Sequence, residues 1–203
     1  MTVANQPHDD AARSHARGRH IADAFRLATL VSIGVAAMWF GIPSTLGFAV
    51  VFAGLLIPRL LQLAGPFDAA FSATILLATW SGVAGLYAAI SWWDLVVHFV
   101  TAGSSAGVLY LLLAQLDVTP GTSMGKALPS RSIIVLTVSF GVTLAVAWEF
   151  LEWFGNAFIS DGIHVGYIDT LTDIAVGGAG ALLTGLLLAM WKNQAADIQT
   201  SAH

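Results

Sequence analysis

Long apolar runs separated by short polar breaks make up most of this chain. After a polar segment over residues 1–22, the pattern predicts six apolar spans, which cover residues 25–42, 45–63, 69–90, 92–116, 133–154 and 167–191. Each span approaches the roughly 20 residues that an α-helix needs to cross the hydrocarbon core of a bilayer. Pro43, Gly65–Pro66 and Ser91 mark the breaks between the first four spans. The pattern therefore predicts an all-α, polytopic membrane protein with a six-helix bundle.

Polar segments flank one predicted membrane domain, which covers residues 23–192. Residues 1–22 contain three arginines and three histidines without an apolar run, and we expect them to form a flexible tail; residues 193–203 form a short C-terminal tail. Hydrophobic residues are 57% of the chain and charged residues only 10%. Charged residues approach about a quarter of a soluble domain, so the composition leaves no room for a separate soluble domain.

The basic residues predict the orientation of the bundle. Lys and Arg accumulate in cytoplasmic loops. If the sides alternate from a cytoplasmic N-terminus, all eight basic residues fall on the cytoplasmic side: Arg13, Arg17, Arg19, Arg26, Arg59, Lys126, Arg131 and Lys192. Aromatic residues support the same threading, because seven of them lie near the outer ends of spans, where such rings prefer the interface: Trp39, Phe40, Trp92, Trp93, Trp153, Phe154 and Tyr167. We therefore expect both termini to be cytoplasmic.

Charge and cysteine content exclude several classes of function. The net charge is −4, which argues against a nucleic-acid partner because phosphate binding needs a basic surface. The chain has no cysteine, so neither a disulfide framework nor a thiolate metal site is available. The bilayer is the expected partner.

Acidic residues in the last three spans form the candidate functional site. Ionisable groups inside a span are costly and usually face a protein interior or a water-filled cavity. Here they occur in pairs three or four residues apart, and each pair therefore shares one helix face. The threading brings all three pairs to the outer half of the bundle: Asp94 with His98, Glu149 with Glu152, and Asp169 with Asp173.

These six residues predict a divalent-metal site. Five crowded carboxylates without a basic partner repel one another, so some must be protonated or a cation must neutralise them. Carboxylate oxygens with one imidazole suit Mg²⁺, Mn²⁺ or Zn²⁺, and there are enough ligands for two ions. Glu149 and Glu152 are the candidate general bases. The alternative for the whole set is a network of carboxyl groups that share protons. Taken individually, Asp94 or Asp169 could instead lie at the membrane interface or cap the start of a helix. Asp161 and His164 are expected to be solvated loop residues, with a lid as the other interpretation.

Small residues predict which spans pack together. Gly103 and Gly107 follow His98 in the fourth span, and Gly177, Gly178, Gly180 and Ala181 follow Asp173 in the sixth. Small residues four apart let helices approach closely. We therefore expect the fourth and sixth spans to be in contact, which would bring His98 and Asp173 together.

Three motifs in the last three spans resemble those of the YjdF-like family of small bacterial inner-membrane proteins. They are Trp92-Trp-Asp-Leu-Val-Val-His-Phe, Trp148-Glu-Phe-Leu-Glu-Trp153 and Tyr167-Ile-Asp-Thr-Leu-Thr-Asp173, the last followed by a Gly/Ala-rich run. The resemblance covers roughly residues 92–181 and implies a multi-pass inner-membrane protein. Matching the motifs position by position implies the same six site residues and adds Trp153 and Thr170. The family brings no established activity.

Two classes of function remain open. In the first, the protein is a metal-dependent membrane hydrolase or transferase that acts on a lipid-linked substrate from the outer leaflet. In the second, the same residues bind divalent cations or protons for transport. Transporter sites usually lie near the bilayer midplane on broken helices, whereas these acids gather in the outer half on spans without an internal proline. That position favours the enzyme. An accessory protein that uses the site structurally is a third interpretation.

Overall fold

The computed structural model describes residues 6–119, 128–158 and 165–200 of the chain and shows only helices there. This confirms the all-α prediction. The seven helices are α1 (Gln6–Trp39), α2 (Gly41–Leu60), α3 (Gly65–Val83), α4 (Leu86–Ala89), α5 (Trp93–Gln115), α6 (Ser130–Phe158) and α7 (Tyr167–Thr200).

Five of the described helices are long and apolar enough to cross a membrane. They are α1, counted from Arg13, α2, α5, α6 and α7, counted to Asn193. The remaining long helix, α3, has 19 residues and carries the buried Asp68. Several apolar spans make this a multi-pass membrane protein, whereas the sixth span and the cytoplasmic position of the termini stay predictions.

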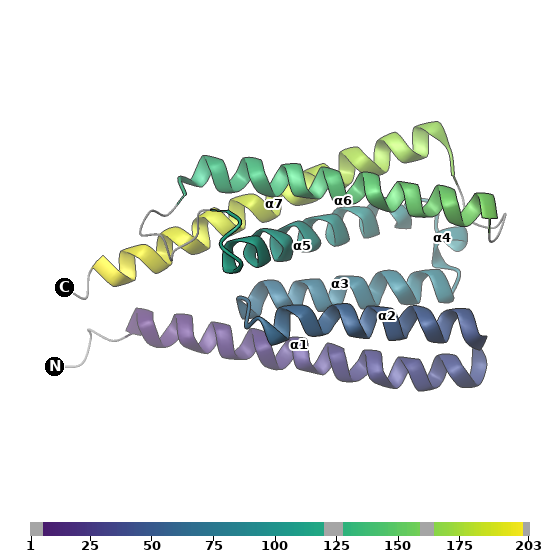
Figure 1. The fold of residues 1–203 in the computed structure, drawn as a ribbon, viewed down its shortest axis with the longest axis horizontal. Helices are drawn as coiled ribbons and strands as arrows, with labels where there is room; N and C mark the ends of the chain where they lie inside the picture. Colours follow the sequence, from purple (N-terminus) through teal and green to yellow (C-terminus); the bar gives the residue numbers. More distant parts are fainter. Residues whose placement is uncertain (1–5, 120–127, 159–164, 201–203) are drawn as a thin grey trace.

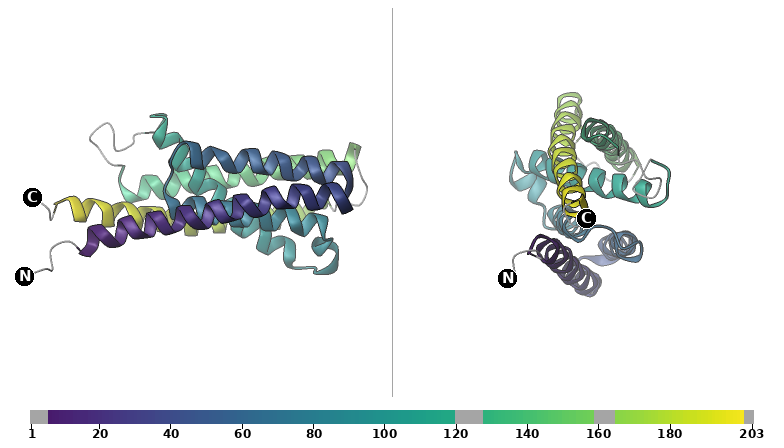
Figure 2. Two further views of the ribbon diagram at one scale, coloured as in Figure 1. Left: turned by 90° about the horizontal axis from the view of Figure 1, so that it is seen from below. Right: turned by 90° about the vertical axis from the view of Figure 1, so that its left-hand side faces the viewer.

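The six long helices form two groups of three, and the short helix α4 contacts α3 and α5. Helices α1, α2 and α3 contact one another, as do α5, α6 and α7, and the contact of α3 with α5 joins the groups. Figure 1 shows the first group below the second. Both described chain ends lie at the same end of the elongated bundle, as the two views in Figure 2 show. We call the opposite end the distal end.

Several helix boundaries differ from those predicted. Helix α7 continues to Thr200, through most of the predicted C-terminal tail, and α6 extends past both ends of the fifth span. Helix α1 begins at Gln6, so most of the segment predicted as a flexible tail is helical and continuous with the first span. Its polar part packs on the start of α3, where His15 Nδ1 accepts a 3.0 Å hydrogen bond from the Gly65 N–H. The third span ends at Val83 rather than residue 90, because Gly85 adopts the left-handed conformation, with φ of 69°, before the single turn of α4.

Glycines hold the second group together. A Cβ at Gly180 of α7 would collide with the carbonyl of Phe99 in α5, and a Cβ at Gly103 would lie 2.7 Å from the Gly180 oxygen. In α6, Gly141 similarly accommodates the Cβ of Ala181 in α7. Backbones approach this closely only where no side chain intervenes. The predicted contact between the fourth and sixth spans is therefore confirmed.

A network of charged side chains holds the first group together near its terminal end. The buried Arg26 of α1 donates to Asp68 of α3 at 2.6 Å, to the Leu55 carbonyl of α2 at 2.7 Å and to Asp23 at 2.9 Å. The side chain of Arg59 pairs with Asp23 at 3.0 Å and is 43% exposed. The buried charges of Arg26 and Asp68 therefore neutralise each other.

Candidate functional site

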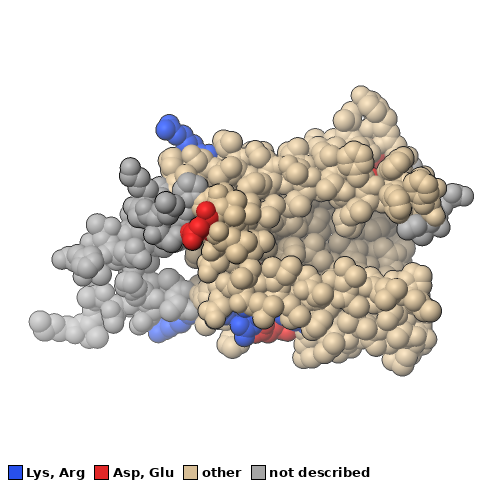
Figure 3. Space-filling view, in the orientation of Figure 1, with Lys and Arg blue, Asp and Glu red and all other residues tan. Residues whose placement is uncertain are grey.

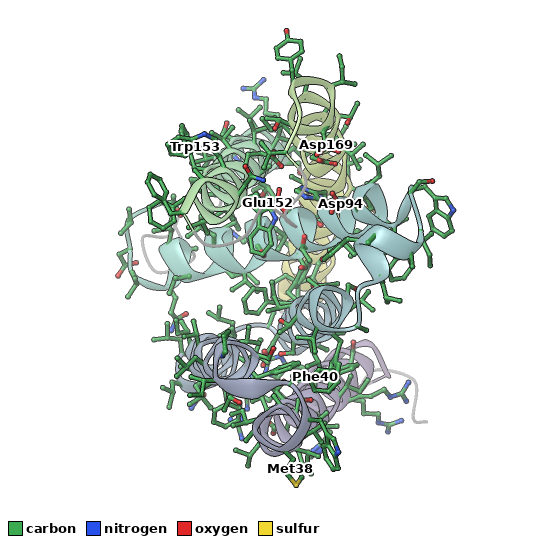
Figure 4. The ribbon with its side chains drawn as sticks, turned by 90° about the vertical axis from the view of Figure 1, so that its right-hand side faces the viewer. Met38, Phe40, Asp94, Glu152, Trp153 and Asp169 are labelled. Carbon is green, nitrogen blue, oxygen red and sulfur yellow. The ribbon has the colours of Figure 1, made fainter. Side chains whose placement is uncertain are left out.

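All six predicted site residues lie at the distal end of the second helix group. Asp94 and Asp169 are in the first turns of α5 and α7, where the helix dipole favours negative charge. His98 and Asp173 lie one turn further along, and Glu149 and Glu152 belong to the final turns of α6. Figure 4, viewed from the distal end, shows Asp94, Glu152 and Asp169 gathered between these helices, far from Met38 and Phe40 of the first group. We call the six residues the acidic cluster.

Ligand atoms within the acidic cluster come close enough to share a cation. Three overlapping groups each offer three such atoms within 4.8 Å of one another: Asp94, His98 and Glu152; His98, Glu149 and Asp173; and Asp94, Asp169 and Asp173. The imidazole of His98 lies between two carboxylates, with Nε2 3.5 Å from Asp94 Oδ1 and Nδ1 3.8 Å from Glu149 Oε1. All six residues therefore belong to one connected set.

The centre of the cluster is buried and its polar atoms are not satisfied. Side chains of His98, Glu149 and Asp173 are 4%, 8% and 1% exposed. Four of their atoms lack a hydrogen-bond partner: His98 Nε2, Glu149 Oε1 and both carboxylate oxygens of Asp173. Leaving a buried polar atom unpaired costs about 1–3 kcal/mol, and more for a charged group. The centre therefore fits a ligand that would satisfy several of these atoms at once.

Aromatic side chains form hydrogen bonds within and around the acidic cluster. Trp148 Nε1 donates to Glu152 Oε1 at 2.9 Å from one turn earlier in α6. Trp93 Nε1 donates to Ser81 Oγ at 2.9 Å, which ties the start of α5 to α3. Burial, together with the nearby carboxylates of Asp94 and Glu152, raises the pKa of Tyr87 in α4, so its hydroxyl stays neutral; it donates to the Ala78 carbonyl at 3.2 Å.

Basic residues are remote from the acidic cluster. The sequence contains no Lys or Arg over residues 60–125 or 132–191. In Figure 3 the visible Lys and Arg side chains lie toward the terminal end together with some acidic side chains, whereas near the distal end only a small acidic area and no basic side chain is visible. Among the residues that the structure describes, no Lys or Arg therefore offsets the repulsion among the five carboxylates, which would be relieved by protonation or by an external cation.

An apolar groove between α6 and the start of α7 adjoins the cluster. Its volume is about 390 Å³, and its lining consists of Val146, Glu149, Phe150, Trp153, Val165, Thr170 and Ile174. Phe150 and Trp153 are 66% and 53% exposed, so the groove opens to the outside of the bundle. Glu149 is its single charged residue and also belongs to the buried centre of the cluster. This carboxylate therefore connects the groove with the candidate metal ligands.

Residue spacing identified the cluster but missed its surroundings. Trp148 lies four residues before Glu152, and that spacing could have indicated the hydrogen bond between them. Trp153 and Thr170, which entered through the resemblance alone, line the groove. The apolar groove residues carry no distinctive pattern along a span. Asp161, His164 and Lys126 lie outside the described residues.

Comparison with known proteins agrees with this architecture. The family described as "Predicted membrane protein (DUF2238)" matches residues 20–194, which include all of the acidic cluster and the groove. No curated protein and no solved structure matches the chain significantly. Because the match extends over most of its length, the chain belongs to this family of membrane proteins, which is the YjdF-like family.

Proposed function

We propose that the acidic cluster binds one or two divalent cations and that the protein is a metal-dependent membrane enzyme. The observation that carries this proposal is the buried centre, where His98, Glu149 and Asp173 present unpaired ligand atoms within 4.8 Å of one another. Buried carboxylates are normally paired with a cation or a hydrogen-bond donor. A metal ion would supply the missing partner for all three side chains together.

The donor set limits which metals fit. Five carboxylates and one imidazole suit Mg²⁺, Mn²⁺ or Zn²⁺, which accept oxygen and nitrogen ligands. A bound ion would supply the charge that polarises a carbonyl or phosphoryl oxygen or activates water. Each three-residue group leaves coordination positions for water or substrate. Glu149 or Glu152 would act as the general base, since α6 contributes both carboxylates to the cluster.

Two features support an enzyme over a transporter. Transporter sites are commonly built on broken helices near the bilayer midplane. Helices α5, α6 and α7 are continuous past the cluster, which lies within two turns of the starts of α5 and α7. In addition, Glu149 faces an apolar groove that opens to the outside of the bundle. A site near one membrane face with access from the lipid suits a lipid-linked substrate.

Metal binding is tested with the Asp173→Asn variant, which keeps the side-chain shape and removes one ligand charge. Mn²⁺ affinity of the purified protein is measured by equilibrium dialysis with detection by electron paramagnetic resonance. We expect the affinity to fall at least about tenfold, since changes even to residues around metal ligands commonly cost that much. Thermal stability without metal should be unchanged or higher, because the substitution relieves repulsion among carboxylates.

Asp117→Asn is the matched control, because Asp117 follows α5 at the opposite end from the cluster. Its Mn²⁺ affinity should equal that of the wild type. Equal affinities in all three proteins, or no binding of Mn²⁺, Mg²⁺ or Zn²⁺ by the wild type, would exclude the metal site. Metal-dependent ion flux through reconstituted vesicles without lipid turnover, lost in Asp173→Asn, would assign the cluster to transport instead.

A further inference from the structure

The groove between α6 and α7 has the properties of a binding site for a lipid chain. Both helices are candidate membrane spans, so the medium around them consists of acyl chains. Next to the groove their outward residues are large and apolar, with Leu151 64% and Ile168 69% exposed. At about 390 Å³, the groove falls within the usual range of about 300–1,000 Å³ for ligand sites.

The groove is amphipathic along its length. Val146, Phe150, Trp153 and Ile174 provide apolar walls, and Thr170 and Glu149 provide the polar groups. Glu149 is 8% exposed, and its Oε1 has no hydrogen-bond partner. An occupant with an apolar chain and a polar head would therefore satisfy both parts of the groove. A membrane lipid has this combination, whereas a water-soluble metabolite or a purely apolar molecule does not.

The charge of the cluster restricts the head group. Five carboxylates lie close together, and neither α5, α6 nor α7 places a Lys or Arg beside them. With one divalent cation bound, the cluster keeps a net negative charge when three or more of its five carboxylates are ionised. A net anionic head would be repelled, because like charges brought together are unfavourable.

From these observations we infer that the groove holds one acyl chain of a membrane lipid without net negative charge, with its head group directed toward Glu149 and the acidic cluster. This inference rests on the proposed function and names the substrate class of the same site. It also assigns the α6–α7 interface as the side from which the substrate reaches the cluster.

The test uses two photoactivatable phospholipids with the same diazirine-bearing acyl chain, one with an ethanolamine head and one with a glycerol head. Each is added as a trace to phosphatidylcholine vesicles that contain the full-length protein, and the crosslinked residues are mapped by mass spectrometry. We expect the zwitterionic probe to label Val146, Phe150 and Ile174 several-fold more than Leu182 and Leu186, which are also exposed apolar residues. The anionic probe should label the groove several-fold less and the two leucines equally.

Val146→Trp fills the groove and should abolish the selective labelling, while Val135→Trp, at an exposed position of the same helix outside the groove, should leave it unchanged. Ile174→Trp repeats the test from α7 if the first variant does not fold. Uniform labelling, or selective labelling that survives both groove variants, would overturn the inference, as would equal labelling by both head groups.

Mn²⁺ binding separates this result from the proposed function. If the wild-type protein binds Mn²⁺ but is labelled uniformly, the proposed metal site stands and the proposed lipid-binding groove is refuted. If the wild-type protein shows selective labelling but binds no divalent cation, the lipid-binding groove stands and the proposal of a metal-dependent enzyme is refuted.

Discussion

At the scale of single residues, the protein contains two buried charged clusters of opposite character. In the first helix group, Arg26 and Asp68 form a short ion pair in which both side chains are almost completely buried. At the distal end of the second group, Asp173 and Glu149 are equally buried, yet their oxygens include atoms with no hydrogen-bond partner. In the first arrangement the two buried charges compensate each other, whereas the second retains unfavourable electrostatics that a bound cation would relieve.

The Arg26–Asp68 pair gives a prediction about stability. Arg26→Met leaves the buried carboxylate of Asp68 without its cation and should lower the free energy of unfolding by about 3–5 kcal/mol. Arg59→Met removes a half-exposed pair with Asp23 and should cost about 0–1 kcal/mol. Unfolding in mixed detergent micelles measures both values. Adding Asp68→Asn to Arg26→Met should recover part of the loss, and equal losses in the two arginine variants would refute the structural role of this pair.

At the scale of helices, close packing of α5 on α7 determines the geometry of the acidic cluster. Gly180 and Gly103 lie one to two turns beyond the candidate ligands Asp173 and His98 in their own helices. Their missing side chains let the two backbones meet, as the contact between Gly180 and the Phe99 carbonyl shows. The distance between the side chains of Asp173 and His98 therefore depends on glycines outside the acidic cluster.

Gly180→Ala should separate α5 from α7 and weaken both the fold and the metal site. Because the new Cβ would meet backbone rather than a flexible side chain, we expect a loss of about 1–3 kcal/mol in unfolding free energy and a reduced Mn²⁺ affinity. Gly54→Ala in α2 is the control, since nothing lies within 4 Å of its added Cβ. It should stabilise the protein by about 0.5–1 kcal/mol. Unchanged Mn²⁺ affinity in Gly180→Ala would show that the cluster does not depend on this contact.

At the scale of the whole molecule, the separation of charges along the bundle predicts its orientation in the membrane. Described basic residues lie toward the terminal end, and the acidic cluster lies at the distal end. Helix α5 has 23 residues, a length of about 35 Å at 1.5 Å per residue, which is sufficient to span the hydrocarbon core. With the basic end in the cytoplasm, the cluster lies in the outer half of the bilayer.

Single cysteines test this orientation, because the chain has no cysteine of its own. Ser91 and Asp117 are exposed residues that flank α5 at opposite ends. Ser91→Cys should react with a membrane-impermeant maleimide in intact cells, whereas Asp117→Cys should react only after the membrane is permeabilised. The reverse pattern would place the acidic cluster on the cytoplasmic side and would exclude access from the outer leaflet.

The sequence by itself determined the helical class, the approximate helices and the members of the acidic cluster. Runs of about 20 apolar residues are local features that favour membrane-spanning helices, and residues three or four apart must share a helix face. When consecutive spans alternate in direction across the membrane, Asp94, Glu149 and Asp169 lie at a similar depth in the bundle. The glycines after His98 and Asp173 also indicated correctly that α5 and α7 would be in contact, because small residues permit close approach.

Only the tertiary structure decided which side chains meet across long sequence separations. The partners of Arg26 lie 29 and 42 residues away, and His15 contacts Gly65 across 50 residues. These contacts accompany a first helix that extends far into the segment predicted as a tail. The groove beside Glu149 likewise lies between two helices, α6 and the start of α7, and its apolar lining resembles the rest of a span. Residue periodicity describes the faces of one helix, whereas the packing of several helices determines which faces leave space between them.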